Sequence, residues 1–205
     1  MNTKTVGNLN KQRYLLRAME LANWAHRDQK RKTSQAPYII HPFHGIILLM
    51  ECGLDPKSDQ DLEILAAFAL HDSIEDNPEE VTYDLIMSKF GTEVARIVRA
   101  VTLDPKNPDK RLSRQKILLD DWKVQIVKVA DILSNTIAIS LSIQRVGLAE
   151  TQKYFKQPIA DRIAMEQEFL GSIKLSGVPM TLINMTESAL AALDELKEVS
   201  SNPLD

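Results

Sequence analysis

Four ionisable residues, His71, Asp72, Glu75 and Asp76, follow directly after the apolar run ILAAFAL. At a helical spacing of four, His71 pairs with Glu75 and Asp72 with Asp76, which places imidazole and carboxylate groups along one side of a helix end. An imidazole beside a carboxylate can bind a divalent cation, and a nearby carboxylate can take a proton from water. The alternative is a solvated acidic helix end, but its carboxylates would repel one another and oppose the helix dipole. This stretch is therefore a candidate site for a divalent cation and for a water molecule bound to it.

Two other segments offer ligands of the same kind. His41, in PYIIHP, stands before a proline at an expected helix start, where a capping or buried histidine is the alternative. Asp131, in VKVADILSN, interrupts an apolar helical stretch, and Asn135 lies one turn further on the same face. A lone carboxylate in such a helix is costly unless it meets a cation or a salt bridge, for example to Lys128. Each segment alone is a weak signal.

These residues require helices to position them. Apolar residues recur at spacings of three and four between glycine and proline breaks, and no series of alternating strands or Asn-Gly turns is present. The predicted fold class is therefore all-α. The predicted helices cover 11–28, 42–52, 61–76, 82–90, 92–102, 111–120, 123–142, 148–170 and 181–199.

The chain length suits one domain. With 205 residues, 44% of them hydrophobic and 26% charged, a full core can be buried. We expect the main domain over residues 10–170, with 171–205 as a C-terminal helical extension of the same domain. Apolar residues at and beyond the start of that extension could pack internally or pair with a second chain in a homodimer. They are Leu170, Leu182, Ile183, Leu190, Ala191 and Leu193.

Composition also limits the compartment and the partners. A single cysteine and a start without an apolar signal region favour the cytoplasm, and no run approaches the 18 or so apolar residues of a membrane span. The net charge of −3 argues against a general nucleic-acid surface. Two segments are nevertheless basic, residues 26–32 and 106–116. They could be solvated surface, or they could bind a compact polyanion such as a phosphorylated small molecule.

In their order and intervals, these motifs resemble the HD superfamily of metal-dependent phosphohydrolases. The resemblance is closer to the hydrolase domain of the RelA/SpoT alarmone enzymes, which includes standalone metazoan SpoT homologues and small bacterial alarmone hydrolases. It extends from about residue 14 to about residue 156. The motifs that carry it are HRDQKRK, PYIIHP, LHDSIED, FGTEVARIVRAVT and VKVADILSN.

The resemblance implies an HD-domain helical bundle that binds one divalent metal, usually manganese. It implies that the metal ligands are His41, His71, Asp72 and Asp131. It also implies that Glu75 and Asp76 position and activate the attacking water, that Arg31 and Lys32 contact the nucleotide, and that Asn135 lines its pocket. From the basic segment we add three candidate phosphate ligands, with a solvated amphipathic helix as the alternative: Arg111, Arg114 and Lys116.

Only four histidines are present, which favours one metal ion over two. Two of them, His41 and His71, are candidate ligands. Of the other two, we expect His26 to pack near the pocket and His44 to have a supporting or surface role. The family commonly has ADRLHN where this chain has ADILSN, so Ile132 and Ser134 replace groups that brace the site. The loop RKTSQAPY lacks the family's glycine.

The resemblance implies a 3′-pyrophosphohydrolase of guanosine 3′,5′-bis(diphosphate) and its pentaphosphate relative, giving GDP or GTP and pyrophosphate. The chain has no room for a synthetase domain, so we expect an enzyme that only degrades the alarmone. One alternative keeps the site and changes the substrate to another phosphorylated nucleotide, such as NADPH with its 2′-phosphate. A second alternative is a nucleotide-binding regulator with a defunct site.

Overall fold

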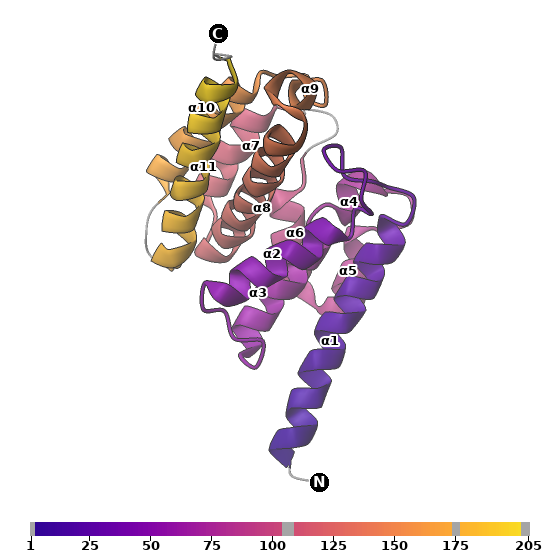
Figure 1. Cartoon of the computed structure of the whole chain (residues 1–205). Helices are drawn as coiled ribbons and strands as arrows, with labels where there is room; N and C mark the ends of the chain where they lie inside the picture. Colours follow the sequence, from indigo (N-terminus) through magenta and orange to yellow (C-terminus); the bar gives the residue numbers. More distant parts are fainter. Residues whose placement is uncertain (1–2, 104–108, 174–176, 202–205) are drawn as a thin grey trace.

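The computed structural model describes residues 3–103, 109–173 and 177–201, and within these ranges it contains helices and no β-strand (Figure 1). The all-α prediction is confirmed. In chain order the helices are α1 (Thr3–Ala25), α2 (Ile40–Glu51), α3 (Asp59–Leu70), α4 (Ser73–Asp76), α5 (Tyr83–Phe90), α6 (Thr92–Val101), α7 (Lys110–Leu119), α8 (Trp122–Val146), α9 (Leu148–Gln152), α10 (Ile159–Ser172) and α11 (Met180–Ser201).

Two predicted helices are each divided in the structure. The helix expected over 61–76 ends at Leu70 and resumes at Ser73, with the amide of His71 bonded to the carbonyl of Phe68 at 3.4 Å. The helix expected over 148–170 is interrupted before Pro158, because proline lacks an amide proton and disfavours a helical conformation in the residue before it. Both single-helix predictions were wrong, and both breaks lie beside the site described below.

Helix α8 is the centre of the fold. It packs against α2, α3, α6 and α11, and its side chains at Val127, Ala130 and Leu133 are buried. By length and hydropathy α8 could cross a membrane, although the sequence suggested that no segment would. Of its most apolar window, 67% is buried inside the protein, so the apolar side chains that make α8 resemble a membrane span serve internal packing here.

Helices α2 and α3 approach each other closely at Gly45. A Cβ atom added to this glycine would lie 2.0 Å from the ring of Phe68, so only glycine leaves room for this ring between the two helices. His41 precedes Gly45 by one turn on α2, and His71 follows Phe68 at the end of α3. This contact therefore fixes the relative position of the segments that carry the two histidines.

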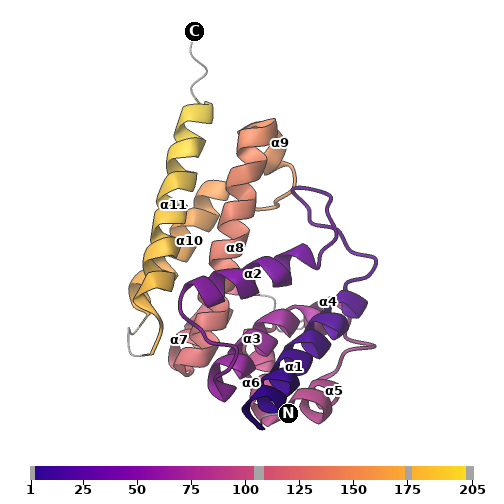
Figure 2. The ribbon, with the colours of Figure 1, turned by 60° about the horizontal axis from the view of Figure 1, so that its bottom comes forward.

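The C-terminal helix α11 lies along α8 (Figure 2). Of the apolar residues that could have paired with a second chain, Leu170, Leu182, Ile183, Leu190 and Leu193 are buried within the chain. Exposed large apolar side chains instead form a stripe on α2. Its members are Ile40, Phe43, Ile47 and Met50.

Candidate metal centre and pocket

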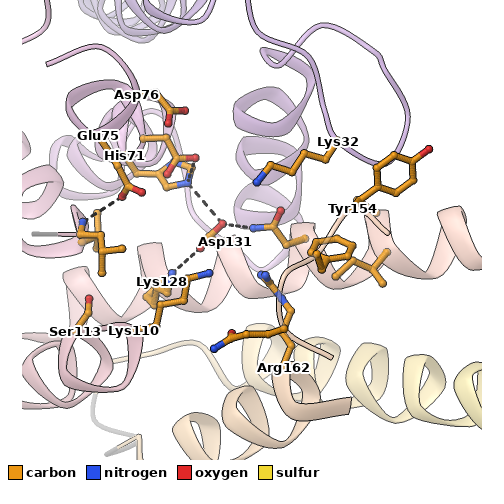
Figure 3. Close-up of a pocket in the computed structure, with 18 of the residues that line it drawn as sticks. Lys32, His71, Glu75, Asp76, Lys110, Ser113, Lys128, Asp131, Tyr154 and Arg162 are labelled. Atoms are coloured by element: carbon orange, nitrogen blue, oxygen red, sulfur yellow. Dashed lines mark hydrogen bonds and ion pairs between the residues drawn. The ribbon is translucent and has the colours of Figure 1, made fainter. Parts of the chain in front are cut away.

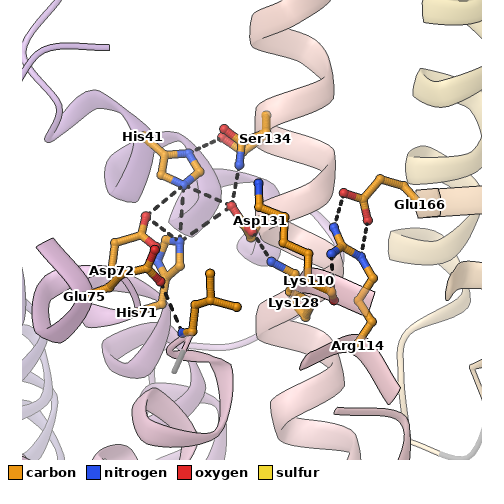
Figure 4. A network of polar contacts seen from close by, with 12 residues as sticks. His41, His71, Asp72, Glu75, Lys110, Arg114, Lys128, Asp131, Ser134 and Glu166 are labelled. Carbon is orange, nitrogen blue, oxygen red and sulfur yellow. Dashed lines mark hydrogen bonds and ion pairs between the residues drawn. The ribbon is translucent and has the colours of Figure 1, made fainter. Parts of the chain in front are cut away.

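Three separate segments supply the four predicted metal ligands. His41 lies in the first turn of α2, His71 and Asp72 lie between α3 and α4, and Asp131 lies on α8. His41 Nε2 is 3.3 Å from both His71 Nε2 and Asp131 Oδ1, and His71 Nε2 is 3.0 Å from Asp72 Oδ2 (Figure 4). Side chains separated by up to 90 positions in the sequence therefore converge on one point.

The second ring nitrogen of each imidazole is already engaged. His71 Nδ1 donates to the carbonyl oxygen of Phe68 at 2.7 Å, and His41 Nδ1 lies 2.9 Å from Ser134 Oγ. Each ring therefore turns Nε2 toward the carboxylates, as in proteins where one imidazole nitrogen binds a metal and the other is held by a hydrogen bond. The ligand atoms of His41, His71 and Asp131 lie within 4.8 Å of one another, an arrangement that fits a divalent cation.

Asp131 uses its two oxygens differently. Oδ2 accepts from Lys128 Nζ at 2.7 Å, the salt bridge considered from the sequence, while Oδ1 accepts from Asn135 Nδ2 at 2.5 Å and faces the imidazoles. Burial acts to raise the pKa of Asp131, but Lys128 and the two histidines outweigh it and hold the pKa well below its usual range. The carboxylate therefore stays ionised and oriented.

Asp72 is held by Tyr38, whose hydroxyl donates to Oδ2 at 2.5 Å. Burial acts to raise the pKa of Asp72, and the neighbouring His71 outweighs it and lowers the pKa. Burial conversely acts to lower the pKa of His71, but Asp72 and Asp131 raise it to about 10. The carboxylates thus hold a proton on His71 where a cation would bind, a further sign that the cluster favours positive charge.

Glu75 and Asp76 are adjacent to this cluster but are not part of it. Glu75 Oε2 accepts from the amide of Leu103 at 3.2 Å, and burial raises the pKa of the Glu75 carboxyl. Burial, with added repulsion from Asp72 and Glu75, raises the pKa of Asp76 to about 6. Carboxyl groups with pKa values raised toward neutrality are suited to proton transfer.

The two remaining histidines support these residues. His26 is buried, its ring centroid lies 4.5 Å from that of Tyr38, and its Nδ1 is 3.4 Å from Asp76 Oδ2. His26 thus packs beside the pocket, as expected. His44 is half-buried, with Nδ1 3.0 Å from Ser134 Oγ.

The cluster forms one wall of a cavity of about 1080 Å³. His71, Asp72, Glu75, Asp76 and Asp131 line its acidic side. Arg31, Lys32 and Asn135 also line the cavity, and Arg31 Nη2 donates to Asn135 Oδ1 at 2.7 Å. Asn135 is in turn bonded to Asp131, so a continuous path of hydrogen bonds joins the basic loop after α1 to the acidic cluster.

Among the cavity residues that were not predicted from the sequence are Lys110 on α7, Tyr154 after α9 and Arg162 on α10 (Figure 3). Burial, together with Arg162 and Lys128, lowers the pKa of Lys110, because these cations repel one another in the cavity. These neighbouring cations favour the binding of an anion in the cavity. Lys110 lies in the basic segment 106–116, but Tyr154 and Arg162 fell within one predicted helix, and only the break before Pro158 brings both to the cavity.

Arg114, expected to bind phosphate, also lines the cavity, but its guanidinium is committed to another residue. Arg114 Nε donates to Glu166 Oε2 at 2.8 Å and Nη2 donates to Oε1, while both residues are buried. This bidentate pair joins α7 to α10 (Figure 4). The geometry assigns Arg114 a role in holding the wall that presents Lys110 and Arg162.

Replacing Glu166 with alanine is expected to destabilise the protein by about 3–5 kcal/mol, because it leaves the buried Arg114 guanidinium without its partner. Urea unfolding measures this change. A double replacement, Arg114→Met with Glu166→Leu, is expected to recover most of the loss, since both buried charges are then removed. Equal stability of Glu166→Ala and the wild type would show that the pair does not stabilise the fold.

Comparisons with known proteins agree with the fold. The family model described as an HD domain matches residues 18–163, so the chain belongs to the HD-domain family. Among solved structures, that of a metazoan ortholog of SpoT that hydrolyzes ppGpp superposes with a TM-score of 0.71 at 20% sequence identity, covering 87% of this chain and 94% of that one. At this identity the likeness concerns the fold.

Curated relatives are more similar in sequence. The guanosine-3′,5′-bis(diphosphate) 3′-pyrophosphohydrolase of Aquifex aeolicus is 34% identical over 157 residues, which are 73% of this chain and 21% of that protein. The human guanosine-3′,5′-bis(diphosphate) 3′-pyrophosphohydrolase MESH1 is 38% identical over 127 residues, 59% of this chain and 66% of that one. The chain thus spans about a fifth of the first relative and under two thirds of the second.

Proposed function

We propose that this protein is a metal-dependent hydrolase that removes the 3′-pyrophosphate from guanosine 3′,5′-bis(diphosphate) and its pentaphosphate relative, without synthetase activity. One observation carries the proposal: the imidazole of His71 and the carboxylates beside it share a single cavity with three basic side chains, Lys32, Lys110 and Arg162. A phosphorylated nucleotide fits such a cavity, because its phosphates need both a cation and basic side chains around them. The names of the Aquifex and human relatives supply the specific substrate.

In this proposal His41, His71, Asp72 and Asp131 would hold one divalent cation, with manganese the expected ion. A bound cation supplies positive charge that stabilises the phosphate oxygens and makes water easier to deprotonate. Glu75 and Asp76 orient the attacking water and accept its proton, as their raised pKa values favour.

The remaining groups bind the substrate. Arg31, stacked 5.5 Å from the Tyr38 ring centre, and Lys32 contact the nucleotide, and Asn135 lines the pocket between Arg31 and Asp131. Lys110 and Arg162 balance phosphate charge on the opposite wall. Arg114 supports this wall through Glu166.

We propose the catalytic domain over residues 10–170 and the segment 171–205 as a helical extension of it. The family match over 18–163 and the packing of α11 on α8 support this division. A cytoplasmic location and a small-molecule partner, in place of nucleic acid or membrane, belong to the same proposal. A homodimer would use the exposed stripe on α2, since the apolar residues of α11 named above, apart from Ala191, are buried.

Incubation of the purified chain with manganese and a panel of phosphorylated nucleotides tests the proposal. We expect pyrophosphate release from guanosine 3′,5′-bis(diphosphate), and no release after the metal is removed with a chelator. Phosphate release from NADPH alone would identify the second substrate class. Tight alarmone binding without turnover under any divalent metal would identify a regulator. Metal analysis of the purified chain, before manganese is added, identifies the ion.

A further inference from the structure

Ser134 joins two histidine rings that lie one turn apart on α2. Its side chain on α8 is buried, and its Oγ is 2.9 Å from His41 Nδ1 and 3.0 Å from His44 Nδ1. Figure 4 shows Ser134 above the cluster, on the side of His41 opposite His71. One hydroxyl group therefore contacts a candidate metal ligand and a histidine outside the ligand set.

The hydroxyl has one proton, so Ser134 can donate to only one of the two rings. For His41 Nε2 to offer its lone pair to a cation, Nδ1 must carry the ring proton and donate it to Ser134 Oγ. The hydroxyl proton is then free for His44 Nδ1 to accept. The two hydrogen bonds thus run in one direction, from His41 through Ser134 to His44.

His71 needs no such arrangement. Its Nδ1 contacts the carbonyl of Phe68, which can only accept, so this contact alone decides which nitrogen carries the proton. A serine hydroxyl can donate or accept, and without a second partner it could donate to His41 Nδ1 and leave the proton on Nε2, facing the cluster. His44 removes this ambiguity by accepting the hydroxyl proton.

We infer that Ser134 and His44 are positioning residues that fix the tautomer of His41 and thereby raise the affinity of the site for a divalent cation. The inference rests on the proposed ligation by His41. It also gives the serine of ADILSN a role, because at this position Ser134 reaches both rings of α2 from the neighbouring helix.

The test is the dissociation constant for Mn²⁺, measured on the full chain by competition with a chelator. We expect Ser134→Ala to weaken Mn²⁺ binding about 10–100-fold, the usual effect of losing a hydrogen bond that holds a ligand imidazole. Ser134→Thr keeps the hydroxyl and is expected to restore affinity. Ser140→Ala is the matched control, since its hydroxyl on the same helix bonds to the carbonyl of Thr136.

His44→Leu tests the second hydrogen bond and is expected to weaken binding as well. If the two residues act as one path, Ser134→Ala with His44→Leu loses little more than Ser134→Ala alone. Mn²⁺ affinity unchanged in either single variant, or losses that add fully, would overturn the inference while leaving the proposed function intact. A wild-type chain that binds no divalent metal would refute the proposed function itself. If Ser134→Ala does not fold, the His44→Leu variant provides the test, because His44 is only half-buried.

Discussion

Asp72→Ala is expected to abolish retention of the divalent metal and, with it, turnover. The variant removes one of the four side chains that converge in the cluster, the carboxylate whose Oδ2 lies 3.0 Å from His71 Nε2. The substitution also removes the negative charge of Asp72, so the site beside His71 attracts a cation less strongly. Metal content after dialysis, measured by elemental analysis together with pyrophosphate release, checks this expectation.

The control for Asp72→Ala is Asp28→Ala, which removes a carboxylate whose side chain is 91% exposed and outside the cavity. Asp28→Ala is expected to retain metal and activity. The folded state of both variants can be compared by circular dichroism. An Asp72→Ala protein that keeps stoichiometric metal would remove Asp72 from the ligand set.

Glu75→Ala has a different expected result: the metal stays bound, but turnover falls at least about a hundredfold, the scale of lost general-base help. Glu75 lies beside the cluster and has a raised pKa, but its carboxylate accepts a hydrogen bond from the amide of Leu103 and not from an imidazole. Single-turnover kinetics at saturating manganese would measure the chemical step separately from metal loss.

Two further variants separate the roles around Glu75. Glu79→Ala removes an exposed carboxylate four residues away that does not line the cavity, and it should leave turnover unchanged. Glu75→Gln keeps an acceptor for Leu103 while removing the base, so it should resemble Glu75→Ala if proton transfer is the lost function. Full activity in metal-replete Glu75→Ala would refute the assigned role.

The helical fold could be predicted because apolar spacing is a local property of the sequence. The motifs also indicated side chains that the structure brings together, since His41, His71, Asp72 and Asp131 carry the types and intervals of a known family. Their roles in metal binding and catalysis stay predictions until the variants are measured.

Other features could not be read from the sequence because they depend on packing between distant segments. Arg114 looked like a free phosphate ligand, but Glu166, 52 positions later, meets it in the fold. The break before Pro158 admits Tyr154 and Arg162 to the cavity, whereas periodicity alone continued the helix. In both cases the local pattern gave the chemical character of the residues correctly, but it did not show what surrounds them in the fold.

The three-segment origin of the cluster has a consequence for folding as well as for chemistry. A cation held by α2, by the turn between α3 and α4, and by α8 would act as a reversible cross-link that closes a loop from His41 to Asp131. Because the unfolded chain holds these groups apart, binding would favour the folded state in proportion to the logarithm of metal concentration. The availability of the metal would then affect the stability of the folded protein as well as its catalytic rate.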